Sequence, residues 1–74
     1  MTKEEKQMRA FGKRIASLRK YNGYTQHEFA ELVDIHHTSL ARIETGQRWP
    51  KLATLYKISN ALKIPLKDLF ETLR

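Results

Sequence analysis

A chain of 74 residues without cysteine is long enough for one small domain, whose marginal core cannot be reinforced by disulfide bonds. Its 14 basic and 8 acidic residues give a formal net charge of +6 at pH 7, which favours an anionic partner, nucleic acid being the commonest. The apolar runs are too short to span a membrane, and no apolar signal segment follows the charged residues 1–6, so we expect a cytoplasmic protein with no membrane partner.

Apolar residues recur with a period near 3.6 through almost the whole chain, and no segment alternates as a strand would. This pattern predicts an all-α fold, a compact five-helix bundle formed by a single domain over residues 1–74. The first helix is expected over about residues 3–21, because Thr2 and Glu5 have the spacing of a capping box and Asn22-Gly23 can end a helix. Its inward positions are Met8, Phe11, Ile15 and Leu18.

Two short helices are expected next, joined by a tight turn at Asp34. The second helix begins at a capping box of Thr25 and Glu28. Its inward positions are Phe29, Leu32 and Val33. The third helix opens near His36 and runs to Glu44, and Gly46 closes it. Leu40 and Ile43 face inward on this helix, and the opposite face presents Thr38, Ala41, Arg42 and Thr45.

Prolines separate the last two expected helices. Residues 47–51 are expected to form a loop, because Pro50 disfavours the helical conformation in the residue before it. The fourth helix covers about residues 52–62, with Leu55, Ile58 and Leu62 inward. After Pro65 a short fifth helix is expected over about residues 66–73, with Leu66, Leu69, Phe70 and Leu73 as its apolar residues.

Several short motifs stand at characteristic spacings between residues 11 and 70. They are Leu18-Arg19, Gly23-Tyr24-Thr25-Gln26, Phe29-Ala30, Leu32-Val33, Arg42-Ile43-Glu44-Thr45-Gly46, Pro50, Leu55, Ala61-Leu62 and Leu69-Phe70. Together they resemble the phage repressor and Cro-like (Xre-type) helix-turn-helix transcriptional regulators, with the helix-turn-helix over about residues 25–45. The resemblance implies a lambda-repressor-like DNA-binding domain whose third helix reads the major groove, while the start of the second helix grips phosphate. Members are usually homodimers on palindromic operators, and a domain of this length looks most like a phage Cro or repressor protein or a restriction–modification controller.

The sequence departs from the family pattern at three places. Asp34 stands where the turn usually has glycine, His36 where a serine or threonine usually begins the third helix, and Lys51-Leu52 where a serine often caps the fourth. Aspartate tolerates the left-handed region better than most residues, so we expect the turn to survive.

The outer face of the third helix carries the residues expected to read bases. The planar guanidinium of Arg42 matches guanine O6 and N7, a contact worth about 1–3 kcal/mol of discrimination, although a solvated or phosphate-bound arginine is the alternative. Thr38 and Ala41 can touch a thymine methyl, and His37 can donate to a guanine or a phosphate; plain surface is the alternative for Thr38 and Ala41.

A second set of residues is expected to hold the DNA backbone without reading sequence. Gln26 lies at the start of the second helix, where free N–H groups attract phosphate, and its amide adds a donor. The expected phosphate contacts are Thr25, Gln26, His36, Ser39, Thr45, Gln47, Arg48 and Lys51. The last of these lie in a stretch, residues 45–67, that has no carboxylate to oppose its basic residues.

The resemblance also implies a structural pair, Arg19 and Glu44, that bridges the first helix to the end of the third. The fifth helix is the expected dimer surface, through Leu66, Leu69, Phe70 and Leu73, because a terminal apolar helix can only half bury itself on a small core. Ordinary core packing is the alternative for these four residues.

Neither a metal nor a cofactor is expected. His36 and His37 are adjacent and so point about 100° apart on a helix, and no cysteine or carboxylate completes a metal site. Histidines near phosphates bind protons more readily, so we predict tighter DNA binding at pH 6 than at pH 8. The chain has no cysteine nucleophile, glycine-rich phosphate loop or recognisable serine–histidine–carboxylate set, which argues against an enzyme.

The leading prediction is a homodimeric, sequence-specific regulator that binds double-stranded DNA and associates with the nucleoid. Activation of transcription would also need a surface that contacts RNA polymerase, and no motif marks one. The main alternative is a protein-interaction module, antitoxin-like or anti-repressor, built on the same fold. A third reading, nonspecific nucleic-acid or RNA binding through charge, lacks an aromatic stacking platform.

Overall fold

The computed structural model describes residues 1–71 and contains four α-helices followed by one 3₁₀ helix in that part of the chain. The α-helices are α1 (Lys3–Tyr21), α2 (Gln26–Leu32), α3 (His37–Glu44) and α4 (Leu52–Leu62), and the 3₁₀ helix η1 spans Leu66–Phe70. The prediction of an all-α fold with a helix-turn-helix is confirmed, whereas the prediction of five α-helices is wrong at the last element.

Both predicted capping boxes are present. The Thr2 hydroxyl accepts the Glu5 N–H at 3.1 Å, and the Glu5 carboxylate accepts the Thr2 N–H at 2.7 Å. Thr25 and Glu28 repeat the arrangement at 3.1 and 2.8 Å. The backbone hydrogen bonds from Thr2 and Thr25 stabilise the ionised carboxylates, which lowers the pKa of Glu5 and of Glu28.

The hydrophobic core draws on every helix. Its buried side chains are Phe11, Ile15, Phe29, Ala30, Val33, Leu40, Ile43, Ile58, Leu62 and Leu69. Leu32 was expected among them, but its side chain is 51% exposed. The buried side of α2 is shared by Phe29, Ala30 and Val33, and the step of about 100° per residue puts Leu32 on the flank of that side.

Two glycines allow α1 to approach the end of α3. A Cβ on Gly12 would lie 2.6 Å from the Glu44 carbonyl oxygen and would also collide with that of Ile43. Gly46 follows α3 with φ +77°, and a Cβ there would lie 2.7 Å from the Arg9 Cα. The backbone of α1 therefore lies directly against the last turn of α3.

The C-terminal element is a 3₁₀ helix rather than the α-helix expected over about residues 66–73. Its i→i+3 bonds run from the Asp68 N–H to the Pro65 carbonyl at 2.9 Å and from the Glu71 N–H to the Asp68 carbonyl at 3.4 Å. Arg14 of α1 also donates to the Asp68 carbonyl, at 2.8 Å, and so holds η1 against α1. A segment this short does not sustain an α-helix by its own propensity, and 3₁₀ geometry is usual for such pieces.

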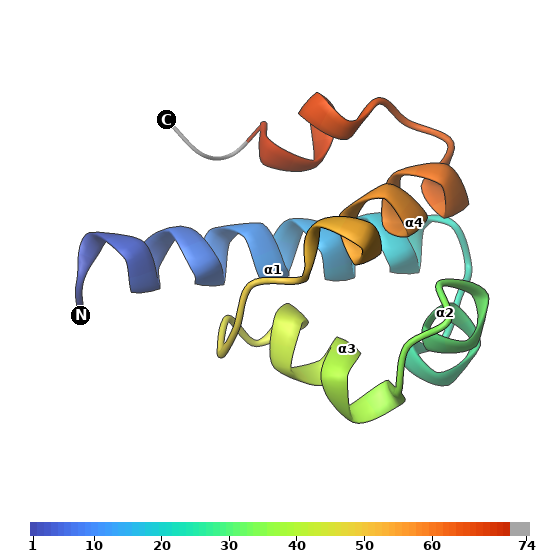
Figure 1. Ribbon diagram of the computed structural model, residues 1–74, viewed down its shortest axis with the longest axis horizontal. Coiled ribbons are helices and arrows are strands. Elements are labelled where there is room, and N and C mark those ends of the chain that lie inside the picture. The colour runs from blue at the N-terminus through green and yellow to red at the C-terminus, as the bar shows by residue number, and fades with distance from the viewer. Residues whose placement is uncertain (72–74) are drawn as a thin grey trace.

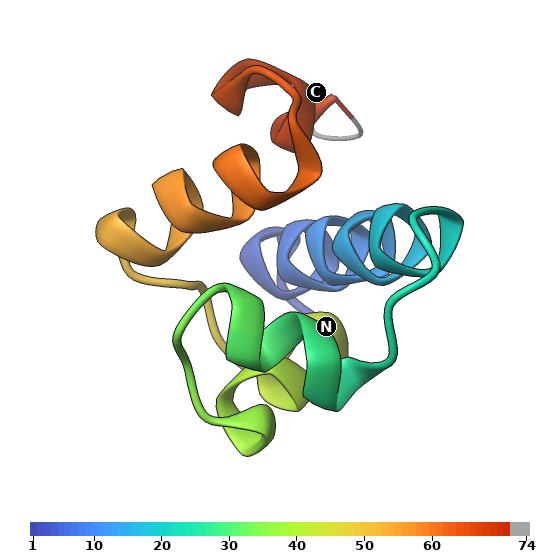
Figure 2. The same cartoon turned by 90° about the vertical axis from the view of Figure 1, so that its right-hand side faces the viewer.

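Helix α1 lies between α3 and η1. In both views α3 is at one side of α1 and η1 is at the opposite side (Figures 1 and 2). The contacts agree with this arrangement, because α1 packs against both α3 and η1 while α2 packs on α3. The outer face of α3 and the surface of η1 are thus separate regions of the molecule.

Within residues 1–71, no helix has both the length and the hydrophobicity that a membrane-spanning segment needs.

Candidate nucleic-acid interface

The turn between α2 and α3 tolerates its unusual aspartate. Asp34 adopts φ 57°, the left-handed conformation that the family usually gives to glycine. The Ile35 N–H donates to the Ala30 carbonyl at 3.0 Å across this turn. Asp34 also lies 3.6 Å from the Lys57 Nζ of α4. The turn therefore keeps its geometry despite the missing glycine.

The outer face of α3 is accessible along its whole length. His37, Thr38 and Arg42 are exposed, and Ala41 is half-buried between them. Leu40 and Ile43 occupy the opposite side and are buried. The helix is therefore docked by one face and leaves its predicted base-reading residues at least partly exposed to solvent.

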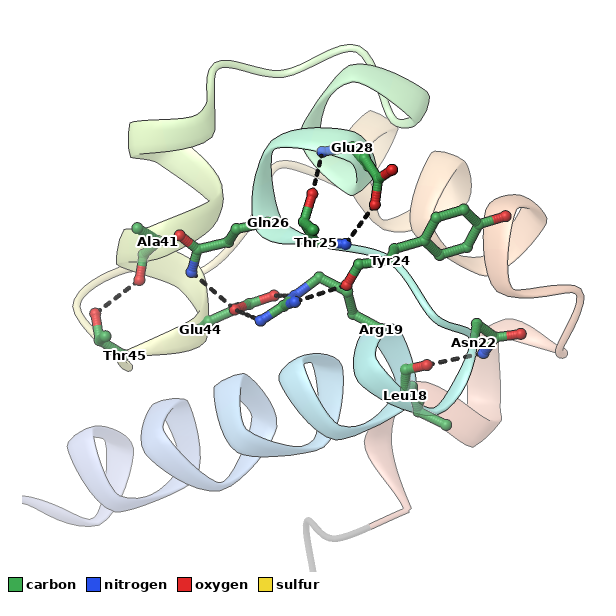
Figure 3. A network of polar contacts seen from close by, with 10 residues as sticks. All are labelled: Leu18, Arg19, Asn22, Tyr24, Thr25, Gln26, Glu28, Ala41, Glu44 and Thr45. Atoms are coloured by element: carbon green, nitrogen blue, oxygen red, sulfur yellow. Dashed lines mark hydrogen bonds and ion pairs between the residues drawn. The ribbon is translucent and has the colours of Figure 1, made fainter.

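A buried polar network joins α1, α2 and α3. Arg19 donates from Nε to Glu44 Oε2 at 2.7 Å and from Nη2 to Glu44 Oε1 at 3.0 Å. Arg19 Nη1 also donates to the Tyr24 carbonyl at 2.8 Å, next to the Thr25 cap. Gln26 Nε2 donates to Glu44 Oε1 at 3.0 Å (Figure 3). The exposed fractions of Arg19 and Glu44 are only 7% and 8%, so their charges are compensated by each other rather than by water.

Several predicted phosphate contacts already have internal partners. Thr25 caps α2, and His36 caps α3 by accepting the Thr38 N–H on Nδ1 at 3.2 Å. The Thr45 hydroxyl donates to the Ala41 carbonyl at 2.8 Å, and Gln47 Nε2 donates to the Thr45 oxygen at 3.0 Å. These bonds order the start of α2 and the two ends of α3, and each side chain keeps an exposed surface.

An open cleft of about 420 Å³ lies between the start of α3 and α4. Four of the predicted phosphate contacts line it: His36, Ser39, Arg48 and Lys51. Lys57 lines the same cleft but was not predicted, although it belongs to the carboxylate-free stretch of residues 45–67. Lys57 lies beside Asp34 because of the way α4 packs, and no local sequence motif predicts that packing.

His27 is a further neighbour of the interface that the sequence did not reveal. The His27 and His37 rings stack with their centroids 4.1 Å apart, and the His36 and His37 rings lie 4.7 Å apart. Desolvation lowers the pKa of His37, and the positive charges that His27 and His36 can carry lower it further. Among the described residues, no group of three or more histidines, cysteines or carboxylates is arranged to hold a metal ion.

Trp49, in the loop between α3 and α4, packs on the core. The centroids of the Trp49 and Phe11 rings are 5.6 Å apart, and the indole N–H donates to the Glu4 carboxylate at 3.3 Å. Phe11 also stacks on Phe70, with ring centroids 5.1 Å apart. The loop after α3 is therefore anchored to α1 by an aromatic side chain.

The expected dimer residues differ in accessibility. Leu69 is completely buried inside the monomer, which corrects its assignment, since no surface of this side chain is left for a partner. Leu66 and Phe70 are half-buried and packed against the core cluster. Leu73 lies outside the described residues. The large apolar side chains with most exposure on α4 are Leu52, at 65%, and Tyr56, at 54%.

Comparison with known proteins agrees with this architecture. The family model described as helix-turn-helix, HTH_3, matches residues 15–69. The HTH-type transcriptional regulator YazB of Bacillus subtilis (strain 168) is 37% identical over 59 residues, which cover 80% of this chain and 86% of YazB. Control protein C.MunI of Mycoplasma sp is 39% identical over 61 residues, covering 81% of this chain and 82% of C.MunI.

A solved structure shows the same fold. The restriction-modification controller protein C.AhdI from Aeromonas hydrophila superposes with a TM-score of 0.81 at 32% identity, covering 85% of this chain and 96% of C.AhdI. Other similar regulators are longer, and the chain spans 47% of one and 43% of another. These relatives are named as a transcriptional regulator, a control protein and a restriction-modification controller. The chain is a member of the helix-turn-helix (HTH_3, Xre-type) family of DNA-binding transcriptional regulators.

Proposed function

We propose that this protein is a homodimeric, sequence-specific regulator that inserts α3 into the major groove of a palindromic operator. The observation that carries the proposal is the one-sided burial of α3. Leu40 is completely buried, whereas Arg42 on the outer face is exposed and has no carboxylate partner within 4.0 Å among the described residues. A docked helix with an exposed, uncompensated guanidinium is suited to contact base edges.

The surroundings of α3 supply the expected backbone contacts. The cleft beside α3 gathers Arg48, Lys51 and Lys57, so phosphates that flank the groove would meet positive charge. Each phosphate neutralised releases counterions, and affinity should therefore fall steeply as salt rises.

A controller-like role is the form of regulation that the relatives favour. C.MunI and C.AhdI are named as a control protein and a restriction-modification controller, and this chain covers most of each. We expect regulation through protein concentration and dimerisation. Contact with RNA polymerase would accompany activation, and transcription assays with purified polymerase on the selected operator test for it.

The direct test is selection from random duplex DNA at moderate salt, followed by sequencing. Enrichment of a palindrome with half-sites about 34 Å apart, one helical turn, is the expected result. Enrichment of a single half-site would refute the dimer but retain base reading. No enrichment by a folded protein would overturn the proposal and favour the protein-interaction alternative.

A further inference from the structure

The contact between Gln26 and Glu44 joins the buried network to the predicted DNA surface. Gln26 is the first residue of α2, and Glu44 is the last residue of α3. Figure 3 shows the Gln26 side chain reaching across to Glu44 beside Ala41 of the reading helix. The glutamine is half-buried, so one side of it is still accessible from outside.

The carboxylate of Glu44 is held in one position. Arg19 binds both of its oxygens, at 2.7 and 3.0 Å, in the fork geometry of an arginine–carboxylate pair. The adjacent backbone of α1 at Gly12 also leaves the last turn of α3 little room to move. An acceptor fixed in this way can orient a long side chain that would otherwise sample many rotamers.

The Gln26 amide nitrogen carries two hydrogens, and one of them is directed to Glu44 Oε1 at 3.0 Å. We infer that Glu44 is a positioning residue for DNA binding, which holds the Gln26 carboxamide so that its second N–H can donate to a backbone phosphate. The inference rests on the proposed function and deepens it. Ordering this side chain before DNA arrives removes a cost of about two- to tenfold in affinity per subunit.

Charge gives this inference a sharp test. Glu44→Gln removes a negative charge near DNA, and electrostatics alone predicts equal or tighter binding. Positioning predicts the opposite, two- to tenfold weaker binding to every duplex. Glu31→Gln, at an exposed position on α2, removes the same charge and is the matched control, which should bind equally well or more tightly.

A double-mutant cycle identifies the route of the effect. Affinities of the wild-type protein, Glu44→Gln, Gln26→Ala and the double variant are measured on one duplex at fixed salt. The expected result is that Glu44→Gln has no further effect once Gln26 is replaced by alanine. An equal loss in both backgrounds, or tighter binding of Glu44→Gln, would overturn the inference. If the wild-type protein bound no duplex, the proposed function itself would fail.

Glu44→Gln also leaves the buried Arg19 without its charged partner, and this variant could fail to fold. NMR of the wild-type protein supplies the second measurement. A high order parameter of the Gln26 side-chain Nε2–H bonds in the free protein, near that of rigid backbone (about 0.85), supports positioning. A value below about 0.6, typical of a flexible side chain, would contradict it, whatever the folding of the variant.

Discussion

Arg42 is the residue on which the assignment of base reading most depends. It is exposed on the outer face of α3, and its guanidinium suits guanine O6 and N7. We expect Arg42→Ala to relax preference at one base pair by about 1–3 kcal/mol, measured by repeating the DNA selection with the variant.

Arg48→Ala is the matched control for this prediction. Arg48 lines the cleft beside α3, and its loss should weaken binding to all sequences alike and reduce the salt slope by about one. If both variants weakened every site equally, the assignment of Arg42 to base reading would be wrong.

The stacked histidines make binding and stability respond to pH in opposite directions. The pKa of His37 in the free protein lies below its ordinary value of 6.5, since desolvation and the charges of His27 and His36 oppose protonation. The unfolded chain takes up this proton first as the pH falls below about 6.5, so the contribution to folding stability is complete above that pH and declines below it.

Bound DNA should shift the pKa of His37 in the opposite direction, upward. A phosphate near His37 favours the charged imidazole, and we expect its pKa to rise on binding, which makes binding tighter at pH 6 than at pH 8. NMR titration of the His37 ring in the free and bound protein measures both values. Identical pKa values, or an affinity that does not change between these pH values at fixed salt, would contradict the prediction. His37→Gln should remove most of the pH dependence.

Among the contacts between secondary-structure elements, the one between α1 and α3 leaves the least room for an added side-chain atom. Alanine ordinarily stabilises a helix interior relative to glycine by about 1 kcal/mol. Gly12→Ala should instead destabilise this protein by about 1–3 kcal/mol, because the new methyl group meets the backbone carbonyls of Ile43 and Glu44. Chemical denaturation of Gly12→Ala beside Lys13→Ala, at the neighbouring exposed position, measures the effect. A stabilised Gly12→Ala variant would show that the two helices do not pack this closely.

Assembly is a property of the whole molecule, and one of the four residues that the apolar pattern suggested for the dimer surface is inaccessible in the monomer. Leu69 is buried in the core, so Leu69→Ala should lower the monomer's stability by about 2–5 kcal/mol. Leu66 is only half-buried, and Leu66→Asp should weaken dimerisation more than it weakens folding if η1 forms the interface. Sedimentation analysis and denaturation of both variants separate these effects.

The exposed pair Leu52 and Tyr56 on α4 provides the comparison. If Tyr56→Lys dissociated the dimer and Leu66→Asp did not, the interface would lie on α4 rather than on η1. An interface on η1 would leave α3 free, because η1 lies on the far side of α1 from α3 (Figure 1).

Local sequence determined the four α-helices, the two capping boxes and the family. The capping boxes at Thr2 and Thr25 place the starts of α1 and α2 because they involve only residues three apart. The spacing of residues 25–46 was sufficient to indicate the helix-turn-helix and the exposed face of α3, because a docked helix must alternate buried and free sides.

Only the tertiary structure decided what depends on packing between distant elements. The burial of Leu69 and the exposure of Leu32 follow from how η1 and α2 fit the core, which periodicity in short segments does not specify. The stacking of His27 on His37 and the hydrogen bond from Gln26 to Glu44 join different helices, and their spacing in the sequence indicates no contact. The sequence therefore determined which residues the helices present, and the packing of α1 against α3 determined which of them hold one another in place.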